Sequence, residues 1–215
     1  MSVYAVSDLH GHLELWKQIQ SFLNPDDKIY VLGDCGDRGP QGWETIKAVY
    51  NDPRAIYLKG NHEDMLVNAM EDYLAYEVMN NAFSLLVYNG GYETFSDWMT
   101  EGAEQVNWKI KLKKLPLEAT YTNEDGITFK MTHSGCKDKL WGRNFTECIE
   151  KDKVILHGHT PNEYLAAELG EAWTDGVLWY YDDHKCCLDC GTIRSKTTVL
   201  LNLDTCEEII FELRD

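Results

Sequence analysis

Residues 28–40 of the chain read KIYVLGDCGDRGP, in which an apolar run leads directly into a loop of glycines and aspartates. A short apolar run bounded by turn-forming residues is typical of a buried β-strand. Trp43, Ile46 and Val49 follow at the spacing of one helix face. The stretch therefore predicts a strand, a polar loop and an amphipathic helix in succession.

The same unit occurs twice more in the first third of the chain. Residues 3–6 lead into a Ser-Asp-Leu-His-Gly loop, and residues 55–58 lead into a loop that contains Gly-Asn-His-Glu. An amphipathic segment follows each loop. Strands that alternate with helices over short connections favour a mostly parallel sheet, whose carboxyl edge collects the loops.

The remaining chain adds a helical segment and a second run of strands. Residues 64–115 carry apolar side chains at helical spacing, and we interpret them as an inserted helical cap. A hairpin over residues 117–132 follows. Further strands are expected at residues 154–156, 185–188, 197–203 and 207–212. We expect an α/β fold with two facing mixed β-sheets flanked by helices, in a single domain over residues 1–215.

The formal net charge of −16 restricts the partners of the chain. Such a charge repels nucleic-acid backbones and anionic membrane surfaces, so we expect neither as a partner. A phosphate ester bound by so acidic a protein needs strong local positive charge. Bound divalent cations supply that charge most economically, so the composition already favours a metal site.

Several features of the sequence bear on location. Asp8 interrupts the first apolar run too early for a secretory signal, and no uncharged apolar stretch of about 18 residues is present. Seven cysteines are an odd number for a disulfide framework. The cluster of Cys186, Cys187 and Cys190 is interpreted as a strand and turn, with a structural zinc site as the alternative. We expect a cytoplasmic protein with free thiols, and the sequence predicts no oligomeric state.

Five loops carry side chains that ligate metals, each directly after an apolar run. Asp8 and His10 share one loop, so both can face one ion. The two oxygens of Asp34 can bridge two ions about 3.5–4 Å apart, the separation found in two-metal hydrolases. The ligands for a second ion come from three further loops, as Asn61, His133 and His159. A single His after a strand is more often structural, but the conjunction of these loops predicts a dinuclear metal centre.

The order and spacing of these loops carry a resemblance to a known family. Asp-x-His, Gly-Asp-x-x-Asp-Arg-Gly, Gly-Asn-His-Glu, His-Ser-Gly and Gly-His-Thr, spread over residues 8–161, resemble the calcineurin-like metallophosphoesterase superfamily. Within it, the chain is similar to the small bacterial and phage serine/threonine protein phosphatases typified by lambda phage phosphatase. The resemblance implies that family's two-sheet sandwich and a hydrolase of phosphorylated proteins, phosphopeptides or small phosphate esters.

The resemblance also implies how the ligands divide between two divalent metal ions. One ion would be held by Asp8, His10 and Asp34. The other would be held by a set that shares the bridging carboxylate, namely Asp34, Asn61, His133 and His159. Manganese (Mn²⁺) is the usual ion of such bacterial enzymes, with iron or zinc as alternatives, because mixed donors do not choose between them. A metal-bridging hydroxide would attack phosphorus directly, without a covalent phosphoenzyme.

The catalytic and substrate-binding residues come from the same loops. His62 lies beside a metal ligand without being needed by the metals, and the resemblance implies that it protonates the leaving oxygen. Asp37 would orient it and favour its protonated form; a salt bridge to Arg38 or a helix cap is the alternative role for Asp37. Arg38 offers a planar fork to phosphate oxygens. Arg143, in a Trp-Gly-Arg segment, matches a second phosphate-binding arginine, and Asn61 is expected to contact the substrate too.

Two positions depart from the family patterns. Lys59 precedes Gly-Asn-His-Glu where the eukaryotic phosphatases carry Arg, so the charge is kept but bidentate phosphate binding is lost. Pro161 stands where other branches have the second His of Gly-His-x-His. This proline favours the protein-phosphatase and dinucleotide-polyphosphatase branch over nucleases and nucleotidases.

Two alternative functions remain beside the serine/threonine phosphatase. A diadenosine tetraphosphate (dinucleoside polyphosphate) hydrolase shares the two central loops. Aromatic residues of the cap would serve its nucleosides or would simply be core residues, namely Tyr73, Tyr76, Tyr88 and Trp98. The other alternative is a metal-binding interaction protein without activity. The complete ligand set, with the acid and its Asp partner, argues against that reading.

Overall fold

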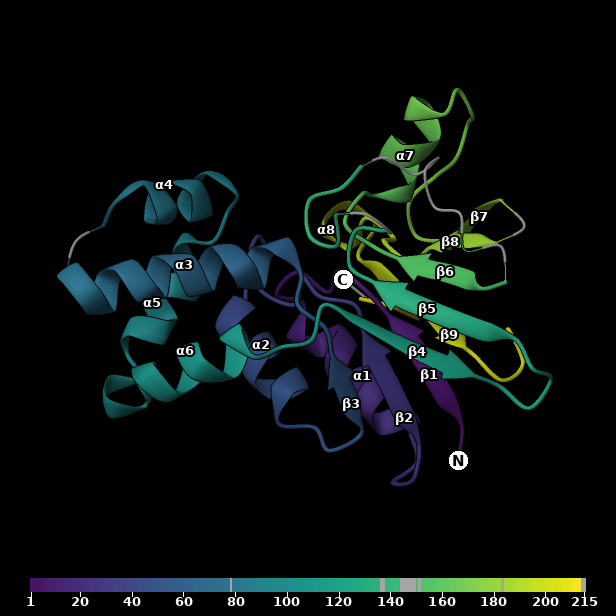
Figure 1. Ribbon diagram of the computed structural model, residues 1–215, viewed down its shortest axis with the longest axis horizontal. Coiled ribbons are helices and arrows are strands. Elements are labelled where there is room, and N and C mark those ends of the chain that lie inside the picture. Colours follow the sequence, from purple (N-terminus) through teal and green to yellow (C-terminus); the bar gives the residue numbers. More distant parts are fainter. Residues whose placement is uncertain (78, 136–137, 144–149, 151, 183, 214–215) are drawn as a thin grey trace.

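The computed structural model describes residues 1–77, 79–135, 138–143, 150, 152–182 and 184–213. Two five-stranded β-sheets face each other and are flanked by helices (Figure 1). The first sheet has the order β10 (Glu208–Glu212), β9 (Thr197–Asn202), β1 (Val3–Val6), β2 (Lys28–Val31) and β3 (Ala55–Tyr57). The second has the order β4 (Glu118–Thr122), β5 (Thr128–Thr132), β6 (Val154–His157), β8 (Lys185–Cys187) and β7 (Trp179–Asp182). This is the α/β architecture expected from the sequence.

Parallel pairing brings the functional loops to strand ends that point the same way within each sheet. In the first sheet β1, β2 and β3 are parallel, whereas β9 runs antiparallel to β1 and β10 antiparallel to β9. In the second sheet β4 and β5 form an antiparallel hairpin, and β5, β6 and β8 are parallel. Parallel neighbours need crossover connections, which α1 (Leu13–Phe22) and α2 (Gly42–Tyr50) provide in the first sheet.

The central strands β1 and β9 of the first sheet are buried on both faces, which explains the continuous apolar run of β1. Val3 and Ala5 of β1 belong to the core between the two sheets, whereas Tyr4 and Val6 belong to the core under the helices. This alternation follows the two-residue period of a strand. Trp16 of α1 and Trp43 of α2 are fully buried in the helical core. The helix expected around Trp43 is therefore present and packs as its pattern predicts.

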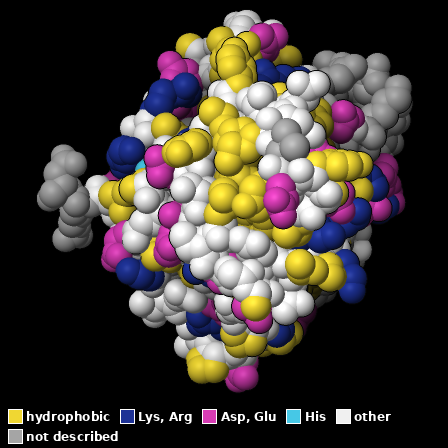
Figure 2. Space-filling view, turned by 90° about the vertical axis from the view of Figure 1, so that its left-hand side faces the viewer, with side chains coloured by type: hydrophobic (Ala, Val, Ile, Leu, Met, Phe, Trp, Pro, Cys, Tyr) yellow, Lys and Arg dark blue, Asp and Glu magenta, His cyan; other side chains and the backbone are white. Residues whose placement is uncertain are grey.

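The helical segment proposed as a cap begins inside α3 (Asn61–Tyr76) and lies to one side of the sheets (Figure 1). It continues through α4 (Asn81–Tyr88), α5 (Tyr92–Met99), a short 3-10 helix η1 (Gly102–Glu104) and α6 (Gln105–Lys113). Trp108 of α6 packs edge-on against Trp43, with ring centroids 5.3 Å apart, so this segment shares the helical core. Its outer face carries exposed apolar side chains among charged ones (Figure 2).

The sequence missed several elements of the second half. β7, α7 (Asn162–Glu168) and the single turn α8 (Thr192–Ser195) were not expected. The two strands expected near the C-terminus are present as β9 and β10, and they return to the first sheet beside β1. Of the helices that the structure describes, none combines the length and the apolar character needed to cross a membrane.

Candidate metal centre

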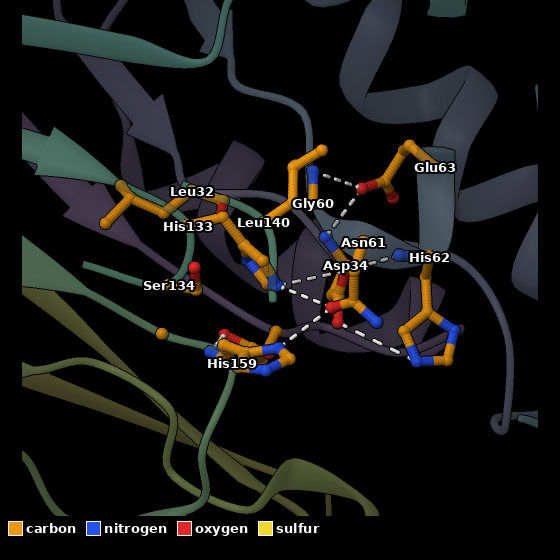
Figure 3. A network of polar contacts seen from close by, with 12 residues as sticks. Leu32, Asp34, Gly60, Asn61, His62, Glu63, His133, Ser134, Leu140 and His159 are labelled. Carbon is orange, nitrogen blue, oxygen red and sulfur yellow. Dashed lines mark hydrogen bonds and ion pairs between the residues drawn. The ribbon is translucent and has the colours of Figure 1, made fainter. Parts of the chain in front are cut away.

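The loops that follow β1, β2, β3, β5 and β6 meet at one place, and the predicted ligands lie there together. The structure buries each of these side chains to an exposed fraction of 9% or less. They are Asp8, His10, Asp34, Asn61, His133 and His159. Figure 3 shows four of them, Asp34, Asn61, His133 and His159. Residues up to 151 positions apart in the chain are in contact, as the backbone N–H of His159 donates to the Asp8 carboxylate at 3.1 Å. The sequence therefore predicted correctly which loops converge.

The backbone of these loops takes conformations that L-residues seldom adopt. Asp8, His10, Asp34 and His159 all have positive φ angles, from 39° to 71°. Each such residue costs roughly 1 kcal/mol or more, and the surrounding structure must hold it in place. Backbone hydrogen bonds between the first two loops do so, because His10 N–H donates to the Asp34 carbonyl at 2.9 Å. Backbone strain at this density is typical of a functional site.

Asp34 lies at the centre of the site, and its two carboxylate oxygens face different histidines. Oδ2 is 3.8 Å from Nε2 of His10 and 3.8 Å from Nε2 of His62. Oδ1 is 3.3 Å from Nε2 of His133. Asp34 thus belongs to two groups of side chains whose ligand atoms lie within 4.8 Å of one another: His10, Asp34 and His62, and Asp34, His133 and His159. One carboxylate shared by two groups is what a pair of ions requires.

Oxygen atoms of Asn61 and Asp34 both lie close to Nε2 of His133, an arrangement that a cation would stabilise. Nδ1 of His133 donates to the Leu32 carbonyl at 2.8 Å, so the neutral ring has a lone pair on Nε2. That nitrogen faces Oδ1 of Asn61 at 2.9 Å as well as the Asp34 carboxylate. Burial lowers the pKa of His133, but the Asp34 charge outweighs it and raises the pKa to about 10. A metal ion at this place would satisfy all three groups.

Two other histidines are prepared as neutral ligands. Burial and the neighbouring His62 hold the pKa of His10 well below its usual range. Burial and the neighbouring His133 lower the pKa of His159 to about 3. Among the described residues, Nε2 of His159 has no hydrogen-bond partner although it is buried. The neutral imidazole is the form that binds metals.

Buried carboxylates add negative charge to the same region. Burial and then the neighbouring Asp189 raise the pKa of Asp8 well above its usual range. Burial also raises the pKa of Asp189, to about 7, and repulsion from Asp34 adds to it. Asp8 lies 3.9 Å from Nε2 of His10 and outside both groups of closest ligand atoms. A cluster of desolvated carboxylates is stabilised by cations, so the residues present fit a site for divalent metals.

His62 lies beside the ligands and is held by Asp37, as the sequence suggested. Its Nδ1 donates to Oδ2 of Asp37 at 2.6 Å, and both side chains are 1% exposed. Burial lowers the pKa of His62, but the Asp34 charge and the hydrogen bond to Asp37 outweigh it and raise the pKa. Nε2 of His62 is buried without a hydrogen-bond partner among the described residues. These neighbours thus favour the protonated imidazole, and its second nitrogen is available.

The predicted phosphate-binding arginines differ in placement. Arg38 is exposed, and its Nη1 donates to Nε2 of His10 at 3.1 Å. Arg143 is also exposed and lies 5.7 Å from the ring of Tyr164, while its charge contributes to the lowered pKa of His159. Lys59 turns away from the site, because its Nζ donates to the Lys113 carbonyl at 3.0 Å and is 3.8 Å from Asp64. Its ammonium group thus bridges the start of α3 and the end of α6.

Sequence reasoning missed one residue that builds the site. The Glu63 carboxylate accepts hydrogen bonds from the backbone N–H groups of Asp34, Cys35 and Gly60 at 2.8–2.9 Å, and from the hydroxyl of Tyr57 at 2.7 Å. It is fully buried at the third position of α3, where its carboxylate accepts the backbone N–H of the N-cap residue Gly60, as the Glu of a capping box does. The position of Glu three residues after Gly60 was the signal that could have revealed this role.

Comparisons with known proteins agree with this geometry. The model of the family described as "Calcineurin-like phosphoesterase" matches residues 1–193. The chain is 27% identical over 150 residues to "Serine/threonine-protein phosphatase 2" of Escherichia coli, covering 67% of this chain and 64% of that protein. It is 25% identical over 185 residues to "Bis(5'-nucleosyl)-tetraphosphatase, symmetrical" of Nitrosococcus oceani, covering 82% of this chain and 60% of that protein. The chain thus spans less than two thirds of either relative.

A solved structure supports the fold. A metallophosphoesterase from Sphaerobacter thermophilus superposes with a TM-score of 0.61 and 17% sequence identity, covering 100% of this chain and 88% of that chain. At this identity the likeness concerns the arrangement of the two sheets and their helices.

Proposed function

The chain belongs to the calcineurin-like phosphoesterase family, and from this premise we propose that it is a two-metal phosphoester hydrolase of the serine/threonine phosphatase type. One observation carries the proposal. The two carboxylate oxygens of Asp34 face two different groups of imidazole nitrogens, one with the ligand His10 and the neighbouring His62 and the other with His133 and His159. The substrate class is a phosphorylated protein or peptide, or a small phosphate ester.

The proposed ligands divide as the sequence suggested, with Asp34 shared. Asp8 and His10 complete one metal position, and Asn61, His133 and His159 complete the other. When bound, two divalent ions supply positive charge for the phosphoryl oxygens and lower the pKa of a water molecule. We propose manganese as the native ion, with iron or zinc as alternatives, because carboxylate, amide and imidazole donors suit all three.

The protein's own groups handle the leaving oxygen and the orientation of the phosphate. His62 donates the proton from Nε2, because Nδ1 is occupied by its hydrogen bond to Asp37. Asp37 keeps the ring in that orientation and stabilises its positive charge. Arg38, exposed beside His10, binds phosphoryl oxygens, and Arg143, whose charge acts on His159, contributes to the same binding. Asn61 contacts both the metal position and the substrate.

One observation favours a second candidate, a dinucleoside polyphosphate hydrolase. Trp141 is 41% exposed, and its ring centroid lies 6.2 Å from that of His159. Tyr164 is 49% exposed beside Arg143. Exposed aromatic faces next to an arginine suit the stacking of a nucleobase. In the cap, by contrast, Trp98 is fully buried and serves the core.

A substrate comparison tests the proposal. The purified chain with Mn²⁺ should hydrolyse an aryl phosphate and a phosphoserine peptide, with a higher kcat/KM for the peptide than for diadenosine tetraphosphate. The opposite preference, lost selectively in Trp141→Ala but kept in the control Trp173→Ala, would establish the second candidate instead. Trp173 is a matched control, since it is 42% exposed and stacks on Trp179 rather than on the site. Hydrolysis of none of the three substrates would overturn both.

We also propose a cytoplasmic location. The described cysteines are free thiols, four of them buried and Cys206 exposed. Free thiols persist in a reducing compartment. A thiol titration of the native and unfolded protein, isolated without added reductant, tests this assignment, because disulfides would contradict it.

A further inference from the structure

The connection between α4 and α5 lies against Asp37 and Arg38, which belong to the same loop after β2 as Asp34. This connection contains the Asn-Gly-Gly turn (residues 89–91), and Thr94 follows in the first turn of α5. The backbone N–H of Asp37 donates to Oγ1 of Thr94 at 3.1 Å, and the backbone N–H of Arg38 donates to the Gly90 carbonyl at 3.0 Å. Asp37, the proposed partner of the acid, and Arg38, the proposed phosphate-binding residue, are therefore both hydrogen-bonded to the helical cap.

Asp37 and Arg38 need such support because both adopt an unfavourable backbone conformation. Each has a φ angle of 63°, in the left-handed region that few residues other than glycine adopt. Two consecutive residues of this kind persist only where neighbouring groups hold them. Thr94 Oγ1 and the Gly90 carbonyl accept the hydrogen bonds that hold the N–H groups of these two residues, and Thr94 is 1% exposed.

The contact is also close enough to exclude larger side chains in the turn. A Cβ atom on Gly91 would lie 2.8 Å from Oδ2 of Asp37, and one on Gly90 would lie 3.1 Å from Cγ of Arg38. The turn also receives the Nε–H of Arg38 on the Asn89 carbonyl, at 3.4 Å. The turn therefore lies close against the Asp37 carboxylate and the Arg38 side chain.

The same atoms bear on proton transfer. Oδ2 of Asp37, beside Gly91, is the oxygen that accepts the hydrogen bond from Nδ1 of His62 at 2.6 Å. Any rotation of the Asp37 backbone would displace this oxygen and, with it, the imidazole. We propose that Thr94, together with the Asn-Gly-Gly turn, is a positioning element that aligns the Asp37–His62 pair for protonation of the leaving group and couples the cap to catalysis. The proposal rests on the proposed function, in which His62 is the acid.

Two substrates with different leaving groups distinguish this positioning role of Thr94 from a general structural role. A phosphoserine peptide releases a poor alkoxide leaving group and needs the acid, whereas 4-nitrophenyl phosphate releases a stable phenolate and needs it little. Thr94→Val removes the hydroxyl at nearly constant volume. It should lower kcat for the peptide about 10- to 100-fold, lower kcat for the aryl phosphate less than about 3-fold, and leave metal content unchanged. Thr94→Ser, which keeps the acceptor, should restore the ratio of the two rates.

Two comparisons complete the test. Thr45→Val is the matched control, because Thr45 is a fully buried threonine whose hydroxyl donates to the Gln41 carbonyl at 2.7 Å and not to a group of Asp37 or His62; its rate ratio should equal that of the unmodified chain. In a His62→Asn background, Thr94→Val should have no further effect on peptide turnover, because the acid is already lost. If Thr94→Val does not fold, Thr94→Cys replaces it, since sulfur is a much weaker acceptor.

The outcomes separate this proposal from the proposed function. An equal loss for both substrates in Thr94→Val, or an additive loss in the His62→Asn background, would show a structural role and overturn the positioning role. Thr94→Val with the same kcat as the unmodified chain for both substrates would overturn the positioning role as well. Absence of turnover in the unmodified chain would instead contradict the proposed function.

Discussion

The Asp34 side chain faces both proposed metal positions, one with each carboxylate oxygen. Burial raises its pKa, but the charges of His133 and His62 outweigh burial and hold the pKa well below its usual range, so the carboxylate is ionised. Its backbone N–H is fixed by Glu63, and its Oδ1 accepts the backbone N–H of His62 at 3.0 Å. The side chain therefore has little freedom to turn, and its two oxygens keep their separate partners.

The role of His62 as the acid leads to the first prediction. His62→Asn should reduce turnover of a phosphoserine peptide at least about 100-fold, because the alkoxide then leaves without a proton. Turnover of 4-nitrophenyl phosphate should fall much less, and bound metal should stay nearly constant by elemental analysis. Equal turnover of the peptide by the variant and the unmodified chain would contradict the acid role.

Asp37 allows a prediction about pH. Its hydrogen bond raises the pKa of His62, so the acid form persists to higher pH than an unperturbed imidazole would allow. Asp37→Asn removes the negative charge and lowers that pKa. The alkaline limb of kcat for the peptide, where the acid loses its proton, should therefore move to lower pH. A pH profile in which this limb stays in place would show that Asp37 does not tune His62.

Sequence reasoning succeeded best at the residue scale for side chains that lie in short motifs. Asp8, His10 and Asp34 follow predicted strands directly, so their meeting follows from the parallel arrangement. It missed Thr94, because its contact with Asp37 joins residues 57 positions apart and no local pattern encodes it. The contacts of Lys59 could not be predicted from the sequence either, since its partners lie on α6 and in the first turn of α3.

At the scale of elements, the start of α3 organises the centre. This helix begins at Asn61, directly after β3, and its Glu63 gathers N–H groups from two loops. Burial raises the pKa of Glu63, and repulsion from Asp34 adds to it. The start of α3 therefore connects the loop after β2 to the loop after β3. The proposed metal position depends on this connection.

Glu63→Gln tests that role. The amide keeps the shape but presents N–H donors to backbone N–H groups, so at least one buried donor loses its partner. We expect the free energy of unfolding to fall by about 3 kcal/mol, because a hydrogen bond to a charged group and the desolvation of an unpaired donor are both involved. Denaturant titration measures this loss. The control is Glu71→Gln on the same helix, whose more exposed pair with Lys113 should contribute less than about 1 kcal/mol; equal losses would contradict the account.

The elements themselves were predictable to different degrees. The three early strand–loop–helix units were found because their periodicity is long enough to recognise. α7 has only seven residues, too few for a helical period to stand out, and β7 pairs with β8 through an irregular register. The place of β9 beside β1 could not be derived either, because pairing between distant strands is decided by packing across the sheet and not by local sequence.

At the scale of the whole molecule, the proposed centre joins the two sheets. Asp8, Asp34 and Asn61 follow strands of the first sheet, whereas His133 and His159 follow strands of the second. Metal ions bound between them would link the sheets and relieve the repulsion among buried carboxylates. In a chain with a net charge of −16, such cations offset a substantial local charge.

This arrangement predicts that metals stabilise the fold. Mn²⁺ at about 100 times its dissociation constant adds about 2.7 kcal/mol if it binds only the native state, which corresponds to an increase in Tm of roughly 5–10 °C for a chain of this size. Differential scanning calorimetry with and without a chelator measures the change. Loss of the increase is expected in Asp34→Asn, and an unmodified chain whose Tm does not respond to metal would contradict the link between the sheets.

The central claim is a two-metal site that depends on Asp34, and metal stoichiometry tests it most directly. The unmodified chain, Asp34→Asn and the control Asp26→Asn, which changes an exposed carboxylate, are loaded with Mn²⁺, desalted and measured by elemental analysis. We expect about two ions per chain in the unmodified protein and the control, and fewer than about one in Asp34→Asn. A single ion in the unmodified chain, or two ions retained by Asp34→Asn, would contradict the account.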